Sequence, residues 1–197
     1  SNLPEADRWI LSKLNTLVKQ VAAALDDYNP TRAGRLIQDF TCDNLSNWYV
    51  RLNRRRFWNP SQQGVTADKQ AAYYTLHTCL KTISQLMSPI APFFGDWLYR
   101  NLIDAQGNNQ ESVHLTTWPE VQESQIDTNL EEAMQLAQDI SSLVHSLRKG
   151  HRIKVRQPLS RLLIPVLTEK TRQQIAQVAP VILTEVNIKA IEFVDDA

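Results

Sequence analysis

The chain has 197 residues, enough to bury a core in one or two domains. Its 21 basic and 21 acidic residues give zero net charge, which argues against a protein that holds nucleic acid by overall positive charge and leaves room only for a local basic patch. Two cysteines are too few for a disulfide framework or a zinc site, and no long apolar run or targeting sequence indicates a membrane span, so we expect a cytoplasmic protein. Cys42 and Cys79 both lie in helical patterns and are expected to be buried thiols.

The first 58 residues carry two helical patterns in succession. Pro4 suits a first helical turn, and apolar residues at helical spacing predict a helix over residues 4–28. Asn29 and Pro30 have the characters of an N-cap and a first helical residue, so a second helix is expected to reach residue 58. Its apolar stripe shifts by about 100° after Asp43-Asn44, which predicts a bend or a change of packing partner midway.

Three more helices are expected before Gly150. A loop over residues 59–64 leads to a helix capped by Thr66, and a proline-rich break at 88–92 separates it from a helix at 93–102. A loop-rich connection follows, with residues 112–115 extended, and Asp127 caps a fifth helix that ends at Gly150. Short connections and amphipathic stripes predict a mainly α fold, an antiparallel helical bundle over residues 1–150.

The pattern changes over residues 151–197. Residues 162–166 and 190–194 are strand-like, and residues 169–186 are helical, which predicts a linker and a small strand–helix–strand (α+β) element. Pro165 suggests that the first strand is an edge strand or contains a bulge. Pro180 is expected to kink or split the helix.

Residues 47–58, N-W-Y-V-R-L-N-R-R-R-F-W, form the most distinctive segment, with four arginines and no acid. On an α-helix, one face would carry Asn47, Arg51, Arg54, Arg55 and Trp58. Guanidinium groups for phosphates and a ring for a base suit a single-stranded RNA loop. Two alternatives stay open. The segment can be a solvated helix end, or the bundle can turn Arg56 outward and bury Arg51 against Asp39 or Asp43.

A second basic cluster without acids runs from Arg148 to Arg156 and includes Lys154. It either extends the positive surface or is a solvated helix end. The histidines lie either among basic residues or far from any carboxylate or cysteine that could act with them. The five glycines form no phosphate-binding loop. No catalytic residue and no metal or cofactor ligand is therefore assigned.

Four stretches together resemble the anticodon-binding region of class I aminoacyl-tRNA synthetases, the isoleucyl enzymes in particular. They are D-R-W-I-L-S-K-L at 7–14, the basic segment at 47–58, S-V-H-L at 112–115 with Trp118-Pro119, and I-K-V-R-Q-P-L at 153–159. The first is shared with valyl and leucyl enzymes and fixes only the superfamily, whereas the second and fourth are isoleucyl-like. The resemblance is clearest over residues 3–159. Ser1-Asn2 looks like a cloning remnant, so we expect a piece of a larger protein.

The resemblance implies a bundle that grips the anticodon stem-loop of an isoleucine tRNA beside the remaining domains of the same synthetase, with no membrane or DNA partner. The larger enzyme would ligate isoleucine to its tRNA with ATP and Mg²⁺, but its nucleotide-binding signatures do not occur here, so this chain alone is expected to be inactive. Arg51, Arg54 and Arg55 would bind phosphates, Trp58 would stack on a base, Asn47 would read a base edge, and Lys154 and Arg156 would extend the positive track. The rivals are a valyl, leucyl or methionyl anticodon domain and a helical module that binds protein.

Overall fold

The structure is a computed structural model that describes residues 3–58, 66–104, 112–166 and 168–194. The loop expected over residues 59–64 lies outside these residues. The chain forms two compact units, Ser1–Ile126 and Asp127–Ala197. Each unit is built on its own core.

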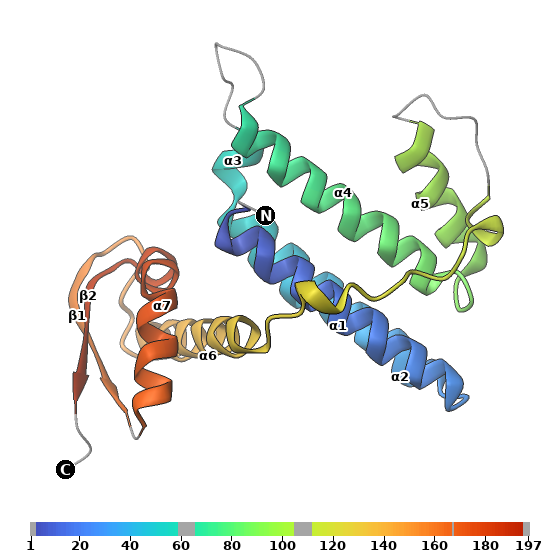
Figure 1. Ribbon diagram of the computed structural model, residues 1–197. Helices are drawn as coiled ribbons and strands as arrows, with labels where there is room; N and C mark the ends of the chain where they lie inside the picture. The colour runs from blue at the N-terminus through green and yellow to red at the C-terminus, as the bar shows by residue number, and fades with distance from the viewer. Residues whose placement is uncertain (1–2, 59–65, 105–111, 167, 195–197) are drawn as a thin grey trace. The chain divides into compact units, whose positions relative to one another are not determined.

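The first unit is helical, as the apolar stripes predict. Helix α1 (Glu5–Asp26) buries Trp9, Ile10 and Val21. It packs against α2 (Pro30–Asp39) and α4 (Ala67–Met87) (Figure 1). The expected caps are present, because the side chain of Asn29 accepts a hydrogen bond from Arg32 N, and Thr66 accepts one from Lys69 N. The sequence thus predicted where these helices begin.

The second predicted helix is not one α-helix. It comprises α2, the π-helix η1 (Phe40–Val50) and the short α3 (Arg54–Trp58). A π-turn takes about one residue more than an α-turn, and one residue corresponds to about 100° on a helix. The observed π-helix therefore explains the shift of the apolar stripe near residue 43. Its wider winding brings Leu45, Trp48 and Tyr49 into the core.

Helices α4 and α5 (Pro92–Asp104) lie against each other in close backbone contact. A Cβ atom on Gly95 would lie 3.0 Å from the carbonyl oxygen of Ser84 and 3.2 Å from Cα of Ser88. The absent side chain is what allows this approach. The two helices form a tight antiparallel pair that continues the bundle (Figure 1).

The connection after α5 is fixed by one carboxylate. Residues 112–115 were expected to be extended, but Val113–Leu115 form a turn of 3₁₀-helix, η2. Asp96 on α5 accepts hydrogen bonds from the Ser112 hydroxyl (2.6 Å), Val113 N (2.9 Å) and Arg100 Nε (2.7 Å). This tertiary anchor favours the turn over a strand, because no partner strand lies beside it among the described residues. A second 3₁₀ turn, η3 (Glu123–Gln125), packs on α1.

We expect Asp96 to make the stability of this connection depend on pH in acid. The hydrogen bonds from Ser112 and Arg100 lower the pKa of Asp96 from 3.8 to about 2. A carboxylate whose pKa is lowered on folding stabilises the fold above its unfolded pKa, and that contribution disappears as pH falls from 3.8 towards 2. Urea unfolding of wild type and Asp96→Asn should differ at neutral pH and converge across that window. A difference that persists unchanged to the acid end would contradict this assignment.

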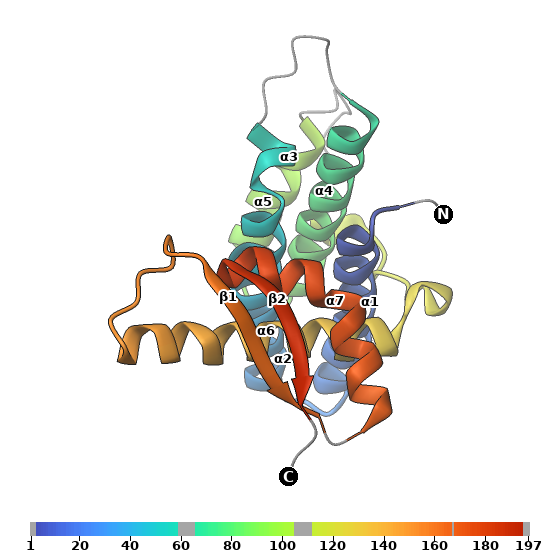
Figure 2. The same cartoon turned by 90° about the vertical axis from the view of Figure 1, so that its left-hand side faces the viewer.

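The second unit combines two helices with a small sheet. Helix α6 (Thr128–Gly150) begins at the cap Asp127, whose side chain accepts a hydrogen bond from Leu130 N, and packs against α7 (Glu169–Val186). Strands β1 (Leu159–Pro165) and β2 (Ile188–Val194) pair in parallel, and α7 forms the crossover between them (Figure 2). The strand–helix–strand prediction is confirmed. Pro165 is the last residue of β1, and α7 passes through Pro180 without a break.

One expectation, the domain division, stays open, and another, on the cysteines, differs from the structure. The fifth helix, expected to complete the bundle over residues 1–150, is grouped with the C-terminal strands because its buried face, including Met134 and Val144, packs on α7. As a division into folding domains, the boundaries 1–150 and 151–197 stay a prediction. Of the two cysteines expected to be buried, Cys79 is buried and Cys42 is exposed, because Cys42 lies on the outer side of the π-helix.

Candidate nucleic-acid interface

The basic segment is attached to the bundle through a buried ion pair. Asp7, which is fully buried on the first turn of α1, accepts hydrogen bonds from Arg56 Nη1 (2.7 Å) and Arg56 Nη2 (2.9 Å). The Tyr49 hydroxyl donates to Asp7 Oδ1 at 2.7 Å. Burial and this hydrogen bond raise the pKa of Tyr49, so that the hydroxyl stays protonated and acts as the donor. Both oxygens of a carboxylate that water does not reach are thereby satisfied.

Arg56 has further partners on its other side. Its Nε donates to Asp68 Oδ2 at 3.0 Å, and its Nη1 donates to the side-chain oxygen of Asn53 at 3.0 Å. The hydrogen bond to Asp7 is the main reason that the pKa of Arg56 is raised. Arg56 therefore links α1, α3 and the start of α4. The alternative in which Arg56 points outward and Arg51 is buried against Asp39 or Asp43 is wrong, since this network occupies Arg56 and leaves Arg51 exposed.

The remaining candidate side chains of the segment are on the surface. Arg51, Arg54 and Arg55 are exposed, Asn47 is exposed, and 63% of Trp58 is accessible to solvent. Arg51 Nε donates to the backbone oxygen of Asn47 at 2.8 Å, and the guanidinium of Arg54 lies over the Trp58 ring, 5.5 Å from its centroid. Direct contacts thus join Asn47 to Arg51 and Arg54 to Trp58.

One uninterrupted α-helical face does not carry these five residues. The helix changes from π to α geometry at Arg51 and is interrupted by a turn at Asn53 before α3 begins. Asn53 is buried, and its side-chain amide donates a hydrogen bond to the backbone carbonyl oxygen of Tyr49 at 2.8 Å. The premise of 100° per residue is therefore wrong here, although the exposure expected for each side chain holds.

The short helix α3 is held by aromatic packing as well. Phe57 is buried and makes edge-to-face contacts with Tyr49 and with Tyr73 of α4, at centroid distances of 6.2 and 5.4 Å. The Tyr73 hydroxyl donates to the Phe57 oxygen at 3.2 Å. A helix of five residues is unstable alone. Here the ion pair of Arg56 and the ring of Phe57 fix it, so that Arg54, Arg55 and Trp58 are presented outward.

The second basic cluster divides into a buried residue and exposed ones. Arg148 is 3% exposed, and its guanidinium donates to four backbone oxygens, those of Lys154, Gln157, Val186 and Asn187, at 2.8 to 3.1 Å. It cannot bind phosphate, because its donors are directed into the protein. It instead fixes the loop after α6 to the end of α7. On that loop, Lys154 and Arg156 are exposed.

Sequence reasoning missed the two residues that organise these surfaces, Asp7 and Arg148. An acid in a first helical turn is explained by the helix dipole alone, so Asp7 gave no separate signal. In the sequence, Arg148 looks like the other basic residues of its cluster, which are exposed. Only the tertiary structure distinguishes a guanidinium that binds the protein's own carbonyl groups from one that faces water.

Two of the histidines contact groups outside these two surfaces. His145 Nε2 lies 3.2 Å from Glu185 of α7, and His77 Nε2 lies 3.4 Å from the Leu102 oxygen. In the part of the chain that the structure describes, no three His, Cys, Asp or Glu side chains gather as a metal ion would require. ATP and Mg²⁺, which are expected for a larger enzyme, are not assigned to any residue of this chain. Among these same residues, no helix has the length and apolar character needed to cross a bilayer.

The fold and the two basic surfaces agree with the similarity of the sequence to known proteins. The family of anticodon-binding domains of tRNA ligases matches residues 7–164, and the chain belongs to this family. It is 58% identical over 193 residues to an isoleucine–tRNA ligase of Cytophaga hutchinsonii, and 55% identical over 195 residues to one of Bacteroides fragilis. An isoleucine–tRNA ligase of Dehalococcoides mccartyi is 44% identical over 190 residues.

These alignments cover nearly the whole chain but a small part of each relative. They take in 98%, 98% and 96% of the chain, and 17%, 17% and 18% of the respective relatives. The names of the relatives favour the isoleucyl enzymes over the valyl, leucyl and methionyl ones that the sequence left open. The resemblance inferred from the four motifs is confirmed.

Proposed function

We propose that this chain binds the anticodon stem-loop of an isoleucine tRNA and serves as the tRNA-gripping part of an isoleucine–tRNA ligase. The whole ligase would esterify isoleucine to its tRNA with ATP and Mg²⁺, and this part would take no direct role in that chemistry. The observation that carries the proposal is that one of the four arginines of the basic segment is held inside the protein and the other three are exposed. Arg56 is used internally, which leaves Arg51, Arg54 and Arg55 exposed in a segment without acids.

Each exposed residue has a role that its chemistry supports. Guanidinium groups bind phosphate oxygens through paired donors, and the exposed ring of Trp58 offers a face for an unstacked base. Arg54 lies over that ring and would move aside, or stack on the base with it, when RNA binds. Asn47 would offer its amide to a base edge. Lys154 and Arg156, on the loop held by Arg148, would supply a second set of phosphate contacts.

A salt series separates this proposal from a helical module that binds protein. Binding of a tRNA through phosphates releases counterions, so the affinity should fall linearly with salt on a logarithmic scale, with a slope of about −0.7 per single-strand phosphate contact. We expect a slope of roughly −3 for the chain and an isoleucine tRNA if three to five cations take part. Affinity that does not change with salt would favour the protein-binding module instead.

Trp58→Ala should weaken tRNA binding about tenfold, because stacking of one base on an aromatic side chain contributes roughly 1–3 kcal/mol. The salt slope should stay unchanged, because no cation is removed. Trp58→Phe should restore most of the affinity. Trp97→Ala removes an equally exposed indole on α5 and serves as the matched control, with no effect expected. Equal affinities of wild type and Trp58→Ala in fluorescence titrations would exclude a stacking role.

Lys154→Ala and Arg156→Ala should each reduce tRNA affinity by a factor of about three to ten and lower the salt slope by roughly 0.7. Both side chains are exposed on a loop whose backbone is held by Arg148, so neither substitution should alter the fold. Lys189→Ala removes an exposed lysine from β2 of the same unit and is the control. If the three variants bind tRNA equally well, the second basic surface has no part in the complex.

A further inference from the structure

The first unit also presents an aromatic surface around the start of α5. Phe93, Phe94 and Trp97 are 91%, 51% and 58% exposed, and Ile90 in the preceding turn is 40% exposed. The rings of Phe94 and Trp97 lie 5.5 Å apart between centroids. We call these four residues the α5 aromatic surface. Large apolar side chains that gather on a surface mark an interaction site, whereas scattered ones do not.

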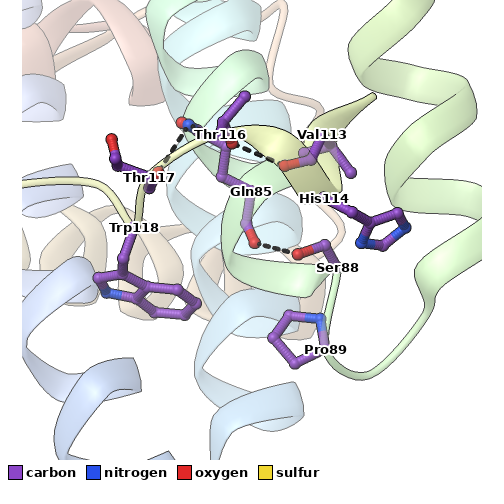
Figure 3. Close-up of a pocket in the computed structure, with 8 residues that line it drawn as sticks. All are labelled: Gln85, Ser88, Pro89, Val113, His114, Thr116, Thr117 and Trp118. Carbon is purple, nitrogen blue, oxygen red and sulfur yellow. Dashed lines mark hydrogen bonds between the residues drawn. The ribbon is translucent and has the colours of Figure 1, made fainter. Parts of the chain in front are cut away.

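A pocket lies at the end of α4, and Pro89, which lines it, directly precedes Ile90 of this surface. It has a volume of about 190 Å³ and is lined by Gln85, Ser88 and Pro89 at the end of α4 and by Val113, His114, Thr116, Thr117 and Trp118. Figure 3 shows the Trp118 ring and Pro89 along its lower edge. Gln85 Nε2 donates hydrogen bonds to Thr116 Oγ1 (3.2 Å) and to the backbone oxygen of Thr117 (3.4 Å). These bonds hold in place the segment that forms one wall of the pocket. A hollow next to exposed aromatic rings is the arrangement in which a partner inserts an anchor residue.

The α5 aromatic surface lacks the cations that RNA binding requires. Residues 82–99 contain no lysine or arginine, and their single charge is Asp96, which is paired with Arg100. The basic segment at 47–58 has four arginines and no acid. Phosphate binding depends on cations. The aromatic surface therefore fits an uncharged, apolar protein surface.

The two surfaces lie at opposite ends of α4. Arg56 and Phe57 of α3 contact Asp68 and Tyr73 at the beginning of this helix, whereas Ile90 and Phe93 follow its last residue, Met87. A helix of 21 residues spans roughly 30 Å at 1.5 Å per residue. Figure 1 shows α3 at one end of α4 and the turn to α5 at the other. A protein partner on α5 would thus leave the basic segment free for RNA.

We propose that the α5 aromatic surface and the adjoining pocket are the docking site for another domain of the same polypeptide. The curated relatives are about six times as long as the chain, since it matches 17% of their length, so most of such a ligase lies outside the residues described here. A folded domain with an apolar face and one anchor side chain for the pocket is the occupant. This inference rests on the proposed place of the chain within a larger ligase, but not on its RNA contacts.

Thiol protection tests the docking site. Phe93→Cys and Phe94→Cys are each made in a Cys42→Ser background, because Cys42 is exposed whereas Cys79 is buried. The rate of maleimide modification at each position is read by peptide mass spectrometry in this chain and in the full-length ligase. The same proteins in urea give the rate of an unprotected thiol. Modification in the full-length ligase should be slower by about tenfold or more at both positions, because reagent access controls the reactivity of a thiol.

The other outcomes overturn the proposal and show why. Equal rates in the chain and in the full-length ligase would mean that no domain covers the surface. Slow modification already in the isolated chain would mean that the surface is covered within the chain or, if the rate depends on concentration, by a second copy. Protection of the isolated chain by added tRNA would assign the surface to RNA. The tRNA affinities of the same variants, measured in parallel, show separately whether the proposed RNA binding fails.

Discussion

We expect Asp7→Asn to lower the free energy of unfolding by about 3 kcal/mol, because removing one partner of a buried ion pair leaves an uncompensated charge. Asp7 is inaccessible to solvent, and the Arg56 side chain is only 15% exposed. Asp68 remains as a second, more exposed partner for Arg56, which keeps the expected loss at the lower end of the range for buried pairs. Urea unfolding followed by circular dichroism measures this change.

Asp26→Asn is the matched control, since it makes the same substitution at an exposed position of the same helix and should change the stability by less than about 0.5 kcal/mol. Asp7→Asn should also weaken tRNA binding, although Asp7 contacts no RNA, because it holds the helix that carries Arg54, Arg55 and Trp58. Unchanged stability in Asp7→Asn would show that the ion pair does not fix this helix.

We expect the triple substitution of Arg51, Arg54 and Arg55 by alanine to reduce tRNA affinity roughly a hundredfold at moderate salt and to lower the salt slope by about 2. Each side chain is exposed, so the fold should be unaffected. The two effects belong together, because the affinity of a phosphate contact comes largely from the counterions that it releases. Fluorescence anisotropy with a labelled isoleucine tRNA over a salt series gives both quantities.

Arg35→Ala removes an exposed arginine from α2 outside the basic segment and should change the affinity by less than about twofold, as a distant surface charge is screened. Arg56→Ala provides a contrasting case, because it should lower the stability before it affects the salt slope. If the triple variant binds tRNA with wild-type affinity and slope, the basic segment is not the RNA-binding surface.

The limits of the helices were predictable from the sequence where local chemistry determines them. The predicted caps Asn29, Thr66 and Asp127 each accept a hydrogen bond from the backbone N–H three residues ahead, which is a signal that short sequence patterns contain. The apolar stripe of α1 likewise predicted most of its buried face. Tyr28, the last residue of the helix expected over residues 4–28, is 94% exposed because α1 ends at Asp26 and the chain turns at Tyr28 with a positive φ of 55°.

The sequence did not reveal features that depend on tertiary contacts. The π-helix was visible only as a shifted stripe, which a bend explains equally well. The 3₁₀ turn at Val113–Leu115 follows from hydrogen bonds to Asp96, a residue 17 positions from Val113. The grouping of α6 with α7 depends on which helix packs against the apolar face of α6, and the sequence does not show this.

The candidate site shows the same division. The basic segment and its exposed residues were predicted from the absence of acids. Which arginine would be internal was not, because Arg54, Arg55 and Arg56 are adjacent and alike in sequence. Their different roles follow from a turn at Asn53 and from Asp7, which lies 49 positions from Arg56. An isolated sequence does not encode that pairing in any local pattern.

The most direct test of the central claim compares the binding of this chain to an isoleucine tRNA and to the same tRNA with its anticodon loop replaced. The claim predicts tighter binding of the native anticodon, a marked salt slope for both RNAs, and loss of the preference in Trp58→Ala. Equal, salt-dependent binding of both RNAs would contradict anticodon reading and leave a surface that grips phosphates only. Absence of binding to either RNA would contradict the proposed function of the chain itself.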